Sequence, residues 1–439
     1  MNRLLFLGIM LCGMLSSCNG AGKSAKAATV VDKTDSCRAD AKNKYEVYIP
    51  QRNSAGEKLP LLVILDAHGE GRFALNKFIP AANEYHLILV ASDRVKNDLA
   101  GYDEAIQTMV DDVRQKYPAG KEIFLSGFSG GARMALGYAL AHPVNGLILC
   151  GALASPDQIS ALRCPVISIS GMDDFNFVET AQYLFQAQNM PANLKIELTH
   201  ASHDWPDSLL LANEVGFLRL SCQAADLPAP DRVQLEAYCQ KQQARMDTLA
   251  GQDDFLRAAL IAHNMASTKV FDDVISFDAA YNRLISNVGY KSQLGRLRQC
   301  LANEMNLRQP YIDAFITKDK PWWQTQISTL NQQIKTERDA YTRDMYLRIK
   351  AFLGIACYSL GKQAIVQHDA VALARILTVY RMLEPENPDM FYYTAFIPYW
   401  KGDNAATVRM LKKALQAGYS DMNQLREDFP SLASECAEK

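Results

Sequence analysis

The chain has 439 residues, which is long enough for two or three domains because single hydrophobic cores rarely grow beyond about 250–300 residues. Its 46 basic and 48 acidic residues nearly balance, giving a formal net charge of -2. This balance excludes the strongly basic surface by which proteins attract nucleic acid, so we expect no nucleic-acid partner.

The N-terminal residues have the pattern of an export signal. Arg3 precedes an apolar run from Leu4 to Leu15, which is too short to span a bilayer and indicates the apolar region of a signal peptide. The tetrapeptide LSSC, ending at Cys18, resembles a bacterial lipobox, which implies a lipidated cysteine and a lipoprotein of the cell envelope. An ordinary cleaved signal is the alternative. We expect residues 1–17 to be a signal peptide and residues 18–44 to be a flexible tether.

Residues 45–222 alternate short apolar runs with amphipathic stretches. Such continuous apolar runs are typical of strands that are buried on both faces. The alternation with helix-like stretches such as YDEAIQTMVDDVRQKY predicts a doubly wound α/β fold with a mostly parallel sheet. The runs are KYEVYIP, LPLLVILDAHG, HLILVASD, EIFLSGFS, NGLILCGA, CPVISISG and LKIELTH.

The strand pattern stops after Cys222. The proline-bearing stretch QAADLPAP predicts a linker at residues 223–230, and residues 231–439 have the period of helices almost throughout. We therefore expect an all-α domain after the α/β domain.

An internal repeat is visible within this helical part. A shift of 34 residues places DAVALARILTVYRML, from Asp369, on DNAATVRMLKKALQA, from Asp403. Residues 354–387 and 388–421 then form two helix pairs that resemble tetratricopeptide repeats. A general array of antiparallel helical hairpins is the alternative reading of residues 354–421.

The stretch LSGFSGGAR contains the candidate nucleophile Ser129, between Gly127 and Gly131. A buried run precedes it and a helical stretch follows it, which is the context of a nucleophile on a sharp strand-to-helix turn. Small neighbours suit such a turn, because the serine takes strained dihedrals and other backbone segments approach closely. A helix start favours negative charge, so the N–H of Gly130 is a predicted oxyanion donor.

Acidic and basic candidates follow two later strands. Asp173 and Asp174 come just beyond PVISISG, and His200 and His203 come at the end of KIELTH or just beyond it. With Ser129, these residues resemble the order serine, acid, histidine of the α/β-hydrolase superfamily, near its dienelactone hydrolase and esterase branch. The resemblance covers residues 45–222.

The resemblance also implies a role for each residue. A glycine, two residues and an aspartate select Asp174, although a one-residue error would leave Asp173. The loop SHDWP resembles a His-x-Trp-Pro loop of esterases, and its position before a helix favours His203 over His200 as the base.

The loop DAHGEG resembles the His-Gly loop that supplies a second oxyanion donor in α/β-hydrolases. This resemblance implies the backbone N–H of Gly69 or of Glu70 as that donor. We interpret His68 as structural, because the base follows the serine in chain order in this family.

These features predict an envelope-anchored serine hydrolase that forms an acyl-enzyme on a small-molecule, polysaccharide or lipid ester and needs no cofactor or metal. A serine peptidase of the same fold is one alternative. A binding or scaffold lipoprotein with an inactive hydrolase domain is another. The helical domain would cover the active site as a lid or bind a protein partner.

Overall fold

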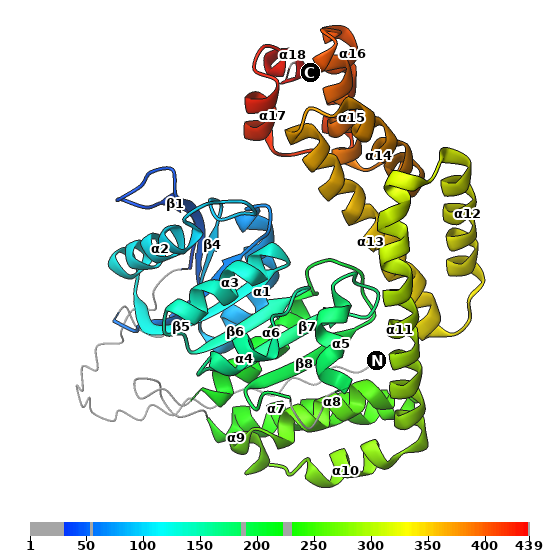
Figure 1. The fold of residues 1–439 in the computed structure, drawn as a ribbon. Coiled ribbons are helices and arrows are strands. Elements are labelled where there is room, and N and C mark those ends of the chain that lie inside the picture. The colour runs from blue at the N-terminus through cyan, green and yellow to red at the C-terminus, as the bar shows by residue number, and fades with distance from the viewer. Residues whose placement is uncertain (1–29, 53–55, 186–189, 223–230, 438–439) are drawn as a thin grey trace, which may run out of the picture.

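The computed structural model describes residues 30–52, 56–185, 190–222 and 231–437 (Figure 1). The predicted signal peptide, its lipidation residue Cys18 and the predicted linker at residues 223–230 lie outside the described residues. These three expectations therefore stay predictions.

An eight-stranded sheet forms the N-terminal part, in the order β1-β2-β4-β3-β5-β6-β7-β8. Strands β3 to β8 pair in parallel, whereas β2 runs antiparallel to its two neighbours, the edge strand β1 and β4. Strands β2 to β8 lie in the seven apolar runs, so the predicted doubly wound α/β fold is confirmed. The strands are β1 (Val31–Ser36), β2 (Lys44–Ile49), β3 (Leu59–Leu65), β4 (Ile88–Ser92), β5 (Ala119–Phe128), β6 (Gly146–Cys150), β7 (Val166–Gly171) and β8 (Leu194–Thr199).

Strand β1 lies inside the segment that we expected to be a tether, so that expectation is wrong for residues 31–36. The strand pairs with β2 from Val31 opposite Ile49 to Ser36 opposite Lys44. Its sequence, VDKTDS, is polar and half-exposed because it forms the edge of the sheet. A strand without an apolar run cannot be predicted from the hydrophobic pattern of the sequence.

Helices cover both faces of the sheet. Helices α1 and α6 share one apolar cluster with the sheet, and α2, α3 and α5 share the cluster on the opposite face. The helices are α1 (Gly71–Tyr85), α2 (Tyr102–Lys116), α3 (Gly130–Ala141), α4 (Pro156–Ala161), α5 (Phe177–Phe185) and α6 (Ser208–Ser221).

The described chain from residue 232 onward is helical, so the predicted all-α region is confirmed. The second half of α13 pairs with α14, and α15 pairs with α16, where the repeat predicts two helix pairs. Their likeness to tetratricopeptide repeats stays a prediction. The helices are α7 (Arg232–Gly251), α8 (Phe255–Ala266), α9 (Lys269–Asp272), α10 (Asp278–Ser286), α11 (Val288–Thr317), α12 (Lys320–Thr336), α13 (Ala340–Val366), α14 (Ala370–Leu383), α15 (Pro388–Trp400), α16 (Asn404–Gln416), α17 (Met422–Asp428) and α18 (Ala433–Ala437).

Helices α7 to α10 share an apolar cluster with the sheet, and α8 and α10 also contact the following helix α11 (Figure 1). Helix α8 covers the edge strand β8, where Asn264 Nδ2 donates to the carbonyl of Ile196 at 3.0 Å and Arg257 Nε donates to that of Leu198 at 2.8 Å. These bonds satisfy edge carbonyls that would otherwise be open to another strand. A separate apolar cluster begins at Cys300. The packing therefore changes within α11, and not at the predicted linker.

Candidate active site

Ser129 lies on the turn between β5 and α3, at the carboxyl end of the parallel strands. Its φ is 53° and its ψ is -116°, a conformation that residues other than glycine rarely adopt and that costs about 1–3 kcal/mol. The Ser129 N–H donates to the carbonyl of Cys150 at 2.8 Å, which ties the turn to β6. The backbone is therefore held in a strained form that directs the side chain away from the sheet.

Close backbone contacts explain the glycines around this serine. A Cβ on Gly131 would lie 2.0 Å from the carbonyl oxygen of Leu65, and one on Gly127 would lie 2.4 Å from the carbonyl carbon of Gly131. Neither contact can be relieved by rotating a side chain. The glycine pattern in the sequence thus reflects the turn on which the serine sits.

The side chains of Ser129, His203 and Asp174 form a chain of hydrogen bonds. His203 Nε2 lies 2.9 Å from Ser129 Oγ, and His203 Nδ1 lies 2.9 Å from Asp174 Oδ2. Asp174 is only 1% exposed, whereas the side chain of His203 is 20% exposed. The structure thus brings together the three residues that the sequence favours, with the carboxylate buried behind the imidazole.

Two aromatic rings and a backbone amide fix this arrangement. The His203 ring packs against Phe128 at a centroid distance of 4.7 Å and against Phe175 at 4.3 Å. The second carboxylate oxygen of Asp174 accepts the N–H of Asn176 at 2.8 Å. The imidazole can therefore keep one orientation between the serine and the acid.

The alternative residues lie elsewhere. The side chain of His200 is 54% exposed and its Nε2 is 3.8 Å from Asp254, whereas His68 is 74% exposed and its Nδ1 is 3.8 Å from Asp66. Burial raises the pKa of Asp173, whose Oδ1 has no hydrogen-bond partner among the described residues. None of these three side chains makes a hydrogen bond to Ser129 in the described part of the chain.

The predicted oxyanion donors are not equally available. Gly130 is the first residue of α3, so its N–H has no partner within the helix. The N–H of Gly69 donates to the carbonyl of Asp66 at 3.2 Å, and the N–H of Glu70 makes only a long contact of 3.4 Å with Asp66 Oδ1. Of the two alternatives for the second donor, the N–H of Glu70 has the weaker existing hydrogen bond.

Sequence reasoning missed Asp66 and Trp205, which join two loops of the site. Buried Asp66 accepts the N–H of His68 at 2.7 Å and the Trp205 Nε1–H at 2.8 Å. The loop after β3 is thereby tied to the loop that carries His203. Asp66 is in the motif DAHGEG and Trp205 is in the motif SHDWP. For Asp66 the available signal was a polar residue directly after a buried strand.

Asn97 was also missed. Its side-chain amide lies directly against Gly130, because a Cβ on that glycine would be 1.7 Å from Asn97 Oδ1. Asn97 is an exposed residue beside the predicted oxyanion donor. Nothing in the sequence pattern around this loop marks the residue.

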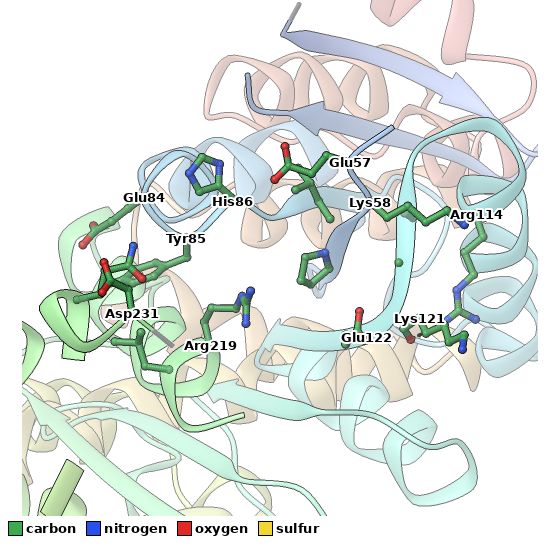
Figure 2. A pocket seen from close by; sticks show the side chains of 16 residues that line it. Glu57, Lys58, Glu84, Tyr85, His86, Arg114, Lys121, Glu122, Arg219 and Asp231 are labelled. Atoms are coloured by element: carbon green, nitrogen blue, oxygen red, sulfur yellow. Dashed lines mark hydrogen bonds between the residues drawn. The ribbon is translucent and has the colours of Figure 1, made fainter. Parts of the chain in front are cut away.

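A cavity of about 940 Å³ lies at the other end of the sheet (Figure 2). Its walls come from the beginnings of β3 and β5 and from the ends of α1 and α6, and charged side chains such as Lys58, Arg114 and Glu122 line it. Ser129 follows the carboxyl end of β5. The cavity therefore cannot hold a substrate in contact with the serine.

No family model and no curated protein matches the sequence. Among solved structures, Est1E from Butyrivibrio proteoclasticus is similar to 42% of this chain over 95% of its own, with a TM-score of 0.34 and 16% identity. An S-formylglutathione hydrolase from Agrobacterium tumefaciens is similar to 43% of this chain over 94% of its own, with a TM-score of 0.34 and 12% identity. LpqC, a poly(3-hydroxybutyrate) depolymerase from Bordetella parapertussis, is similar to 48% of this chain over 94% of its own, with a TM-score of 0.32 and 13% identity. Each likeness covers less than half of the chain, so a functional assignment has to come from the site itself.

Proposed function

We propose that this chain is a serine hydrolase that cleaves carboxylic esters. The observation that carries the proposal is the continuous hydrogen-bond chain from Ser129 through His203 to Asp174, with 2.9 Å at both steps. A neutral serine is a poor nucleophile, and a histidine in contact with it, oriented by a carboxylate, is the usual means of activating it.

The proposed reaction begins when Ser129 Oγ attacks the ester carbonyl and His203 Nε2 accepts its proton. Asp174 keeps the second proton on Nδ1 and stabilises the imidazolium that forms. The imidazolium then protonates the leaving alcohol as the tetrahedral intermediate collapses. A water molecule, deprotonated in turn by His203, hydrolyses the acyl-enzyme and releases the acid.

The charge on the carbonyl oxygen is stabilised, in this proposal, by the backbone N–H groups of Gly130 and Glu70. The amide of Gly130 is free of helical hydrogen bonds and lies at the positive end of the α3 dipole. The long contact from Glu70 to Asp66 would be exchanged for a bond to the substrate. Donors of this kind contribute about 10²–10³-fold in kcat each.

The proposal is tested with Ser129→Ala. We expect this variant to lose about 10⁴–10⁶-fold in kcat on a nitrophenyl acetate substrate, while its thermal unfolding stays close to that of the unchanged protein. A fluorophosphonate probe should label the unchanged protein at Ser129 and leave the variant unlabelled. Equal turnover by both proteins would refute the proposal.

A panel of esters and peptides separates the esterase from the peptidase alternative, because the triad chemistry serves both substrates. Faster cleavage of peptides than of esters would replace the esterase assignment. Failure of the probe to label the folded protein would favour the scaffold alternative. We also propose that Cys18 anchors the protein in the cell envelope. This part of the proposal rests on the N-terminal sequence alone.

A further inference from the structure

Two arginines of the helical region hold the loop that carries Asp174. Arg348, on α13, donates through Nη1 to the carbonyl oxygen of Met172. Arg308, on α11, donates through Nη2 to the carbonyl oxygen of Phe175 at 2.8 Å. These carbonyls belong to the second residue before Asp174 and to the residue directly after it. The loop is therefore held on both sides of its carboxylate.

A buried glutamate joins the two arginines. Glu304 Oε2 lies 2.7 Å from Arg348 Nε, and its Oε1 lies 2.6 Å from Arg308 Nη2. The side chains of Glu304 and Arg348 are both 0% exposed. The guanidinium of Arg348 also packs over the Phe177 ring, 5.1 Å from its centroid, at the start of the helix that follows the acid loop. The cluster thus links α11, α13 and the acid loop.

Stability alone does not account for this cluster. Removing charges from water is costly, and apolar residues of similar volume often stabilise a buried site as well as an ion pair does. The hydrogen bonds from the arginines to the carbonyls of the acid loop are directional, so they fix the position of the backbone. Apolar packing cannot do this. The arrangement therefore points to a requirement for geometry at the acid loop.

We propose that Arg348 and Arg308, oriented by Glu304, are positioning residues for the catalytic acid, an inference that rests on the proposed function of Ser129. They act through the loop and do not touch the substrate. Asp174 orients His203 through one bond of 2.9 Å, and a displacement of about 1 Å at such a contact costs about 10²-fold in rate. The helical region is then a part of the active site.

The test is Arg348→Met in the full chain. We expect kcat to fall about 10- to 100-fold with KM within about two-fold, because the substrate contacts are unchanged and the acid is displaced. A less well placed carboxylate stabilises the imidazolium less, so the acid limb of the pH–rate profile should move to lower pH. Arg348→Lys keeps one donor and the charge, and should recover part of kcat. Arg308→Ala removes the contact to Phe175 and the pairing with Glu304, and should give a smaller loss because Arg348 still holds the carbonyl of Met172.

The matched control is Arg245→Met. Arg245 pairs with the buried Glu197 at 2.7 Å and so joins α7 to β8, without contacting the acid loop. This variant should be destabilised and yet keep kcat within about two-fold. Unchanged kcat and pH profile in both Arg348→Met and Arg308→Ala would overturn the inference, as would equal losses in the Arg245 control. Activity that survives Ser129→Ala would instead refute the proposed function, whatever the arginine variants do.

Discussion

Gly127→Ala is the sharpest test of the turn that presents Ser129. A Cβ at this position would lie 2.4 Å from both the carbonyl carbon and the oxygen of Gly131, which is about 1 Å less than an ordinary contact of 3.4 Å. Because both atoms are backbone, the turn itself has to move. We expect a destabilisation of about 1–3 kcal/mol from overpacking. A shift of about 1 Å of Ser129 relative to His203 should cost a further factor of about 10² in kcat/KM.

The assay combines urea unfolding with hydrolysis of a nitrophenyl ester at a temperature where the variant is folded. Gly295→Ala is the matched control, because nothing lies within 4 Å of its Cβ and the residue is inside α11. That variant should gain about 0.5–1 kcal/mol, since alanine is the better helix former, and its activity should not change. A Gly127→Ala protein with the stability and activity of the unchanged chain would refute our account of the turn.

Two further outcomes concern the scaffold. Burial, and secondarily the charge of Glu197, raises the pKa of Glu214 from 4.5 to about 8, so the folded protein holds a proton between these values that the unfolded chain has released. The contribution of Glu214 to stability should therefore fall as pH rises from 4.5 to 8. Glu214→Gln should show a smaller fall in Tm between pH 5 and pH 8 than the unchanged protein. An equal fall in both proteins would contradict this prediction. A chain that ends at Cys222 should be insoluble, because it loses the helices that cover β8 and complete one apolar cluster. Its soluble fraction and circular dichroism, compared with those of the full chain, provide the measurement, and a truncated chain that unfolds cooperatively would contradict this view.

The buried strands and the order of the site residues could be predicted from the sequence because both are local patterns. Each strand of the parallel sheet is one apolar run, and Ser129, Asp174 and His203 each follow the end of a strand within four residues. The choice between neighbours was harder. Asp173 and Asp174 differ by one position, and only the three-dimensional turn shows that Asp174 lies 2.9 Å from His203.

The covering of the sheet edge could not be predicted, because it depends on contacts between distant segments. Helix α8 has an ordinary amphipathic pattern, and nothing in it indicates that Asn264 bonds to the carbonyl of Ile196. The proline-bearing stretch after Cys222 has the composition of a domain boundary. The chain nevertheless continues to build the same core for several helices beyond it, so composition alone misplaces the change in packing.

The role of the helical region also could not be predicted from the sequence, because it too depends on contacts between distant segments. Arg348 and Met172 are 176 residues apart, and an arginine in a helix is normally read as a solvated side chain. A lid over the cleft and a surface for a partner were the two roles that the sequence suggested, and both treat the region as an addition to a complete hydrolase. Helix α11 contributes Leu297 and Leu301 to a cluster on the sheet, and Cys300 to the cluster of the later helices. Because Glu304 follows on the same helix, the arginines that hold the acid loop lie at the junction of the two cores. Any rearrangement of that junction is therefore transmitted to the loop of Asp174 through the two hydrogen bonds that the arginines donate to it. The alignment of the proposed triad then depends on residues more than a hundred positions beyond it.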